Sequence, residues 1–108
     1  MSTLAKPEPR AKVKARQRRA KATAWQVLRA TVYDRDLGRC RVCHVPVKFQ
    51  SAYPWDIGHT HHLTYRSRGG ADRVENLVLL CGECHSDVHD RRLVLTGTAD
   101  ALRVERVQ

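Results

Sequence analysis

Apolar residues recur at helical spacing in the first half of the chain. They lie three or four positions apart, at Trp25, Leu28 and Val32. This spacing predicts a helix over Ala24–Asp36, with Thr23 as its N-cap and Gly38 as its C-terminal stop. We therefore expect the folded part of the chain to begin with a helix.

Shorter patterns in the second half of the chain predict strands. Asn76–Leu80 is the strongest strand signal, and Trp55–His62 is a second candidate in which alternate residues share a face. A helical stretch is expected at His85–Arg91. Leu93–Leu95 and Leu102–Arg106 suggest a closing β-hairpin, although a frayed terminus fits the same residues. This mixture of helix and strand predicts a small α+β domain.

The first 22 residues differ from the rest of the chain in composition. They carry eight Lys or Arg residues and one Glu, in a chain of 108 residues with a net charge of +9. We expect a disordered basic tail over residues 1–22, helical only when its charges are neutralised, and a folded domain over residues 23–108. Counterion release attracts such a tail to a polyanion, and a solubilising tail without a partner is the alternative. The candidate nucleic-acid contacts in the tail are Lys12, Lys14, Arg16, Arg18 and Arg19.

Four cysteines form two pairs with the spacing of metal ligands, Cys40-x-x-Cys43 and Cys81-x-x-Cys84. A domain of this size buries only about 60–65% of the surface of its unfolded chain, so a further stabilising cross-link, such as a bound metal ion, is expected. Two knuckles of this kind hold a structural zinc ion; two disulfides or four unrelated thiols are the alternatives. The longest apolar run, Leu77–Cys81, is too short to span a membrane. We expect a reducing, cytoplasmic compartment.

Five of the six histidines lie between His59 and His89. On a helix, residues four positions apart share a face, so His85 and His89 can bind one ion together. His61, on the neighbouring strand, can supply a third ligand. Three neutral imidazoles leave coordination positions open for water and a phosphate oxygen, which predicts a catalytic rather than a structural divalent ion.

His62 has a different expected role. Adjacent residues of a strand point to opposite faces, so His61 and His62 should not bind the same ion. A histidine near neutrality can take a proton from a water molecule that attacks a phosphodiester, which is general-base catalysis. Asn76 is expected to tie the loop that holds His62. We interpret His44 and His59 as surface or hydrogen-bonded histidines.

The order of these residues closely resembles the HNH endonuclease family. The resemblance covers about residues 25 to 89, and the three residues that name the family correspond to His62, Asn76 and His85. The two cysteine pairs resemble the zinc-containing branch found in phages and bacteria. The resemblance implies the ββα-metal fold, in which the hairpin of residues 55–62 and 76–80 packs with the helix around the catalytic ion.

The resemblance also implies a function. The chain would be a metal-dependent endonuclease that hydrolyses DNA phosphodiester bonds and leaves 5′-phosphate and 3′-hydroxyl ends. It assigns His62 as the general base, Asn76 as the residue that orients the loop, and His61, His85 and His89 as metal ligands. Many relatives carry Asp or Glu where His61 stands, whereas nuclease colicins carry His. The identity of the catalytic ion is therefore left open, with Mg²⁺, Mn²⁺, Ni²⁺ and Zn²⁺ as the candidates.

Two further residues and two other functions complete the picture from the sequence. Arg66 and Arg68 flank the expected substrate position and can hold phosphates, or they can belong to a solvated loop. One alternative function is a non-catalytic zinc-ribbon module that binds DNA or RNA through the basic tail. Another is a nuclease that acts mainly as the partner of another protein, such as the DNA-packaging machinery of a phage.

Overall fold

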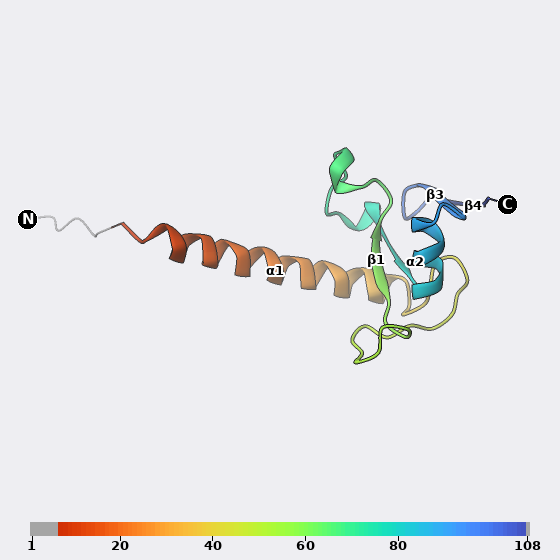
Figure 1. The fold of residues 1–108 in the computed structure, drawn as a ribbon, viewed down its shortest axis with the longest axis horizontal. Coiled ribbons are helices and arrows are strands. Elements are labelled where there is room, and N and C mark those ends of the chain that lie inside the picture. Colours follow the sequence, from red (N-terminus) through yellow and green to blue (C-terminus); the bar gives the residue numbers. More distant parts are fainter. Residues whose placement is uncertain (1–6, 108) are drawn as a thin grey trace, which may run out of the picture.

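The computed structural model describes residues 7–107 (Figure 1), so the first six residues of the expected tail lie outside the described part. Two α-helices, two 3-10 helices and four strands follow one another along the described chain. They are α1 (Arg10–Arg35), β1 (His59–His62), η1 (Arg66–Arg68), η2 (Val74–Asn76), β2 (Leu77–Leu80), α2 (Gly82–His89), β3 (Leu93–Gly97) and β4 (Leu102–Arg106). The predicted α+β class is confirmed, and no described helix is both long and apolar enough to cross a membrane.

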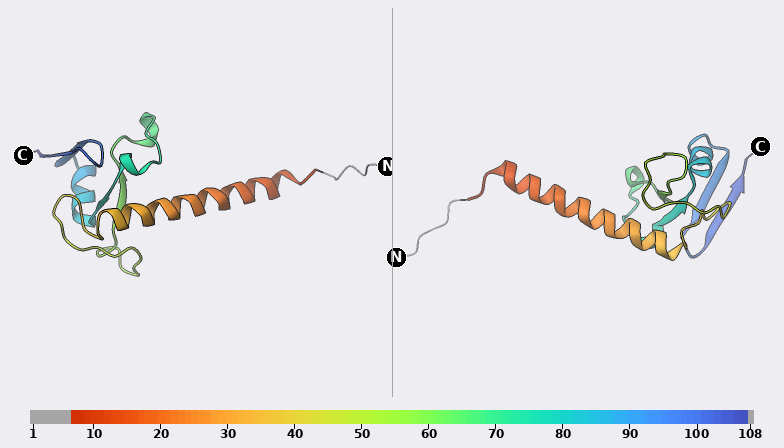
Figure 2. Two further views of the ribbon diagram at one scale, coloured as in Figure 1. Left: turned by 180° about the vertical axis from the view of Figure 1, so that it is seen from behind. Right: turned by 90° about the horizontal axis from the view of Figure 1, so that it is seen from below.

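The first helix is longer than predicted. It begins at Arg10, directly after Pro9, rather than at Ala24. Residues 10–22, which the sequence suggests are a disordered tail, are therefore helical in the structure, and the expected boundary at residue 23 falls inside one continuous helix. The physical reason is composition, because Ala, Lys, Arg and Gln dominate this segment and are strong helix formers. Figures 1 and 2 show this half of α1 projecting away from the other elements.

The two residues expected to cap the helix behave differently. Thr23 lies inside α1, and its hydroxyl donates a hydrogen bond to the carbonyl oxygen of Arg19 at 2.9 Å, so the predicted N-cap is wrong. Gly38 does follow the end of the helix, with φ of +64° and its N–H bonded to the carbonyl oxygen of Tyr33 at 3.0 Å. A Cβ atom at Gly38 would meet the Tyr33 hydroxyl at 2.9 Å, so the position requires glycine.

β1 and β2 pair as an antiparallel hairpin in which His59 faces Leu80 and His62 faces Leu77. β1 is shorter than the predicted strand from Trp55, because β2 ends at Leu80 and offers no partner further along. The next residue, Cys81, instead caps α2. The closing hairpin of β3 and β4 is present as predicted.

α2 also departs slightly from the prediction, since it begins at Gly82 rather than His85 and ends at His89 rather than Arg91. The earlier start follows from the cap, in which the Cys81 sulfur accepts a hydrogen bond from the Cys84 amide at 3.3 Å. Arg91 has φ of +60°, which no residue adopts within an α-helix.

The core lies around β2, whose four residues are all buried. The C-terminal half of α1 packs on one side of the hairpin, and α2 with β3 completes the other side (Figure 2). Val32 from α1 and Leu93 from β3 are among the residues buried against it. Each fully buried aliphatic side chain contributes about 1.5–3 kcal/mol, so β2 is the main apolar anchor of this small domain.

A buried carboxylate ties the end of α1 to the core. The Asp36 side chain, 1% exposed, accepts hydrogen bonds from Arg35 at 2.8 Å and Arg41 at 3.0 Å, and from the Leu79 amide at 2.9 Å. Arg41 in turn donates to the carbonyl oxygen of Ala99 at 2.7 Å. Burial raises the pKa of Asp36, but these hydrogen bonds and the positive charge of Arg35 outweigh it, so the pKa is lowered.

We predict that Asp36→Asn destabilises the domain by about 3 kcal/mol at neutral pH, because two arginines lose a buried counter-ion. The folded-state pKa of Asp36 lies below its unfolded value of about 3.9. Its contribution is therefore complete above that value and is lost as the pH falls through the folded pKa. Urea unfolding of both proteins at several pH values measures this difference.

The exposed carboxylate of Asp34, on the same helix, is the matched control. Asp34→Asn should change the free energy of unfolding by less than about 0.5 kcal/mol. Acid release of a bound metal affects wild type and variant alike, so the quantity to follow is the gap between them. A gap that stays constant from neutral to strongly acidic pH would contradict the role of Asp36.

Candidate active site

The two knuckles bring four cysteine sulfurs together. The Sγ atoms of Cys40, Cys43, Cys81 and Cys84 all lie within 4.8 Å of one another, and all four are free thiols. Tetrahedral Zn–S bonds of about 2.3 Å separate the sulfurs by about 3.8 Å. The Sγ atoms of Cys43 and Cys81 are 3.6 Å apart. The geometry therefore fits a structural metal site and does not match the alternative of two disulfides.

The electrostatics of this cysteine site also favour a cation. Burial raises the pKa of the Cys40 thiol, but backbone amides, among them those of Cys43 and Cys81, outweigh it and lower the pKa to about 7. The pKa of Cys84 is raised, by burial and then by the neighbouring thiols. Several thiolates cannot share such a space unless a cation offsets their charge. A divalent ion such as zinc supplies that charge.

The three expected metal ligands gather at a different face of α2 from the one that carries Cys84. The Nε2 atoms of His85 and His89 are 3.2 Å apart, as expected for residues one turn apart on a helix. The ring of His61 stands edge-on to both, with centroids 5.8 Å from His85 and 6.4 Å from His89. They line one hollow of about 340 Å³, together with Thr60, His62, Tyr65, Arg66 and Ser67.

Among the described residues, the four cysteines are close enough to hold a metal ion as they stand, and the three histidines do not form a second group of that kind. The pKa values of His61 and His85 are both lowered to about 4, mainly by burial and then by the neighbouring histidines. Both imidazoles are therefore neutral near pH 7, which is the form that binds a metal.

His59, interpreted from the sequence as a surface or hydrogen-bonded residue, lies against this group of histidines. Its ring stacks on His85 with centroids 4.4 Å apart and an angle of 5° between the planes. Burial, followed by the charge of Arg29, lowers its pKa. His59 is two residues before His61 on β1, so both side chains leave the same face of the strand. The alternation of faces along the predicted strand was the feature of the sequence that could have placed His59 beside His61.

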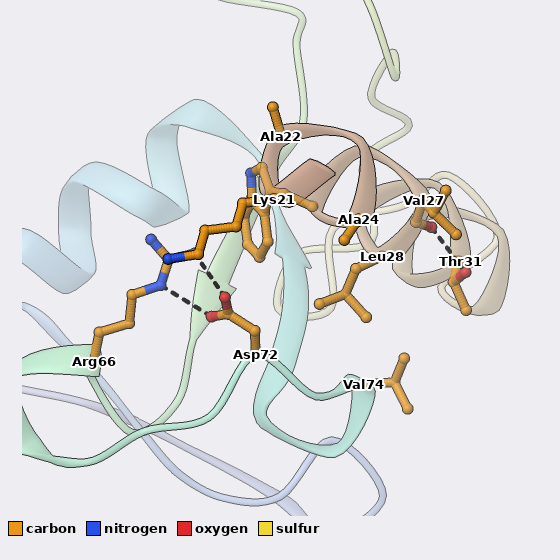
Figure 3. Close-up of a pocket in the computed structure, with 10 residues that line it drawn as sticks. Lys21, Ala22, Ala24, Val27, Leu28, Thr31, Arg66, Asp72 and Val74 are labelled. Atoms are coloured by element: carbon orange, nitrogen blue, oxygen red, sulfur yellow. Dashed lines mark hydrogen bonds and ion pairs between the residues drawn. The ribbon is translucent and has the colours of Figure 1, made fainter. Parts of the chain in front are cut away.

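His62 points to the other face of β1, as strand alternation predicts. Its ring stacks on Trp25 of α1, with centroids 5.5 Å apart, and its Nε2 lies 2.7 Å from a carboxylate oxygen of Asp72. Arg66 donates to the same carboxylate at 2.9 and 3.2 Å (Figure 3). Its guanidinium also lies over the Trp25 ring, 4.9 Å from the centroid. The sequence analysis missed Trp25 and Asp72 as neighbours of His62, because nothing in their spacing connects them to it.

Asn76 ties both ends of the loop between β1 and β2. Its side-chain oxygen accepts the Thr64 amide at 2.8 Å, and its nitrogen donates to the carbonyl oxygens of Thr64 at 2.9 Å and Ala71 at 3.0 Å. The loop is tight, since a Cβ atom at Gly70 would lie 1.8 Å from the Thr64 carbonyl oxygen. This amide therefore fixes the backbone directly before Asp72.

The expected nucleic-acid contacts fall into two groups. Arg66 and Arg68 lie on η1, where Arg66 lines the hollow and Arg68 is exposed. The others lie on the half of α1 that projects away from the other elements (Figure 1); they are Lys12, Lys14, Arg16, Arg18 and Arg19. All five are exposed, and Arg16 forms an ion pair with Glu8. The structure therefore brings the histidines together, whereas the basic residues of the expected tail lie apart from them.

Comparison with known proteins identifies the segment that holds both sites. Residues 40–91 match the family model described as HNH endonuclease. No curated protein and no solved structure gives a match. The matched residues include both cysteine knuckles, the β1–β2 hairpin and α2. Residues 40–91 therefore form a domain of the HNH endonuclease family, with four cysteines arranged to bind a metal ion.

Proposed function

We propose that the protein is a metal-dependent endonuclease that hydrolyses DNA phosphodiester bonds and leaves 5′-phosphate and 3′-hydroxyl ends. HNH nuclease domains act on DNA. The observation that carries the proposal is the meeting of His61, His85 and His89 in one hollow, with His62 lining it as well. A domain that only binds nucleic acid does not require four histidines grouped in this way, so the non-catalytic alternative is not favoured.

In this proposal each histidine has one task. His61, His85 and His89 would hold a single divalent ion, which would supply positive charge to the phosphate and to the departing 3′ oxygen. His62 takes the proton from the attacking water. Because the Nε2 of His62 faces Asp72, that carboxylate favours the tautomer with hydrogen on Nε2 and leaves the lone pair on Nδ1 for the water proton.

The residues around His62 hold its ring in place. Trp25 covers one face of the ring, and Asp72 accepts at its edge. Asn76 supports this arrangement by fixing the loop that leads to Asp72. A base held in this way loses little conformational entropy when the substrate binds.

Charge on α1 and η1 supports DNA as the substrate. Arg10, Lys14, Arg18 and Lys21 are spaced three or four residues apart, and Trp25 continues the same row, so this basic face leads to the side of His62. With Arg66 and Arg68 they can contact backbone phosphates without reading sequence. A reducing, cytoplasmic compartment suits four free thiols, and a phage packaging partner stays a prediction from the sequence.

We predict that His62→Ala lowers the rate of DNA cleavage by about 10²–10⁴-fold, the usual contribution of a general base. DNA binding and zinc content should stay within about twofold of wild type, because His62 touches neither the phosphates nor the sulfurs in this proposal. Nicking of a supercoiled plasmid, with Mg²⁺, Mn²⁺, Ni²⁺ and Zn²⁺ supplied in turn, measures the rate.

The matched control is His44→Asn. His44 is an exposed histidine with φ of +65°, a conformation that asparagine tolerates. This variant should cut at the wild-type rate. Undiminished cutting by His62→Ala, in a preparation free of other nucleases, would remove His62 as the base.

We also predict one tightly bound zinc ion per chain, held by the four cysteines and separate from the catalytic ion. Elemental analysis should find it in protein purified without added metal, and Cys84→Ser should release it and unfold the domain. His89→Ala should keep this zinc but lose cleavage. A chain without zinc, whose stability a chelator leaves unchanged, would contradict the structural role.

A further inference from the structure

The loop before β1 exposes two large aromatic rings. Tyr53 is 53% exposed and Trp55 is 73% exposed. Their rings stack on each other, with centroids 4.7 Å apart and planes 21° apart. Neither ring packs into the core, although the domain is small and gains most of its stability from buried apolar surface. The fold therefore leaves the position of this pair unexplained.

The backbone of the loop that carries the two rings is tied at its base. The Lys48 amide donates to the carbonyl oxygen of Asp56 and the Gly58 amide to that of Lys48, both at 2.8 Å. The Lys48 ammonium also pairs with the Asp56 carboxylate at 3.2 Å. Within the loop, the hydroxyl oxygen of Ser51 accepts the Tyr53 amide at 3.0 Å. A binding surface held in advance loses less entropy when a ligand arrives.

The aromatic loop lies beside the histidine hollow. Trp55 lines a cleft of about 540 Å³ together with His59 and His85, and His85 also lines the hollow. His85 therefore borders both spaces, and the ring of His59 stacks on it from the side of the cleft. A nucleic-acid strand with one phosphate at His85 and His89 therefore has a neighbouring nucleotide within reach of Trp55.

We propose that Tyr53 and Trp55 form a platform for an unpaired nucleobase next to the phosphate that is cut. The proposal rests on the proposed nuclease function and extends it to the substrate class, which is DNA with unpaired nucleotides at the cleavage site. A base inside an intact duplex has both faces covered by its neighbours, so only an unpaired base can stack on the rings.

The surroundings of the platform favour a base over a protein partner. A stable protein interface buries about 800 Å² on each side around an apolar centre. Here Trp55 and Pro54 share the cleft with the polar residues Glu83 and Ser86, so the apolar surface is much smaller than such an interface needs. A flat aromatic pair among polar groups matches the size and chemistry of one base, which is apolar on its faces and polar at its edges.

The test separates stacking from charge, with the full chain and no added divalent ion, so that nothing is cut. Fluorescence anisotropy measures the affinity for a short single-stranded oligonucleotide and for an abasic oligonucleotide with the same number of phosphates. Wild type should bind the base-bearing strand more tightly. Trp55→Ala should weaken that binding by about tenfold and leave the abasic strand unchanged, since stacking contributes about 1–3 kcal/mol per base.

Two further variants complete the test. Trp55→Phe should restore most of the affinity, because phenylalanine keeps an aromatic face. Val104→Ala, at a 46% exposed position on β4, should bind both strands as wild type does. Equal affinity of wild type for the two strands, or an equal loss on both strands in Trp55→Ala, would overturn the platform. An equal loss on both strands would also point to a change of fold. Equal affinity of wild type for the two strands is what a surface for a protein partner predicts.

A cleavage assay then relates the platform to the nuclease. Wild type should cut a strand within a bubble or flap in preference to the same sequence in a duplex, and Trp55→Ala should lose that preference. If wild type cuts nothing but binds bases through Trp55, the nuclease proposal fails, and the two rings remain a base-binding surface without a cleavage site beside it. If it cuts duplex and bubble equally, the proposed substrate class fails and the nuclease stands.

Discussion

The convergence of four sulfurs on one point is the constraint on which the rest of this domain depends. It joins two segments about forty residues apart in sequence, the turn at Cys40–Cys43 and the start of α2 at Cys81–Cys84. Cys81 also caps α2, so the cysteine site fixes both the position and the rotation of that helix. His85 directly follows Cys84 and points about 100° away from it around the helix. The cysteine site therefore also determines the orientation of the histidine hollow.

A second constraint comes from the two faces of β1. His61 faces α2 and joins the proposed metal ligands, whereas His62 faces α1 and stacks on Trp25. The alternation of a strand thus separates two adjacent imidazoles into different surroundings, one lined by histidines and one by an aromatic ring and a carboxylate. Asp36 contributes at a distance, because it fixes the end of α1 against β2. The packing of α1, β1 and α2 together therefore holds this pair of neighbouring histidines, which no one of the three elements could do alone.

The sequence predicted the parts of this site that depend on local spacing. The spacing within each cysteine pair, the buried strand at Asn76–Leu80 and the shared helix face of His85 and His89 follow from residues a few positions apart. The meeting of the two cysteine pairs, and of His61 with His85, joins distant segments and was expected because such residues bind one ion together. Contacts that no shared ion requires were not predicted. The pairing of Asp72 with His62, and the stack of Trp25 from α1 on the same ring, depend on how three elements pack. The start of α1 was missed for another reason, since charge was given more weight than helix propensity.

The chemistry of the hollow decides where substrate selectivity must come from. Its lining of histidines, Arg66 and hydroxyl side chains suits a metal ion and a phosphate, which every nucleic acid presents alike. Discrimination between nucleic acids must therefore come from the surfaces at the two ends of β1. The end at His62 meets the basic face of α1 and Arg66, which interact with phosphates of any sequence. The end at His59 meets the aromatic loop (Figure 1). Charge at one end and stacking at the other act on different parts of a nucleotide, so affinity and the choice of strand structure can vary independently in this fold.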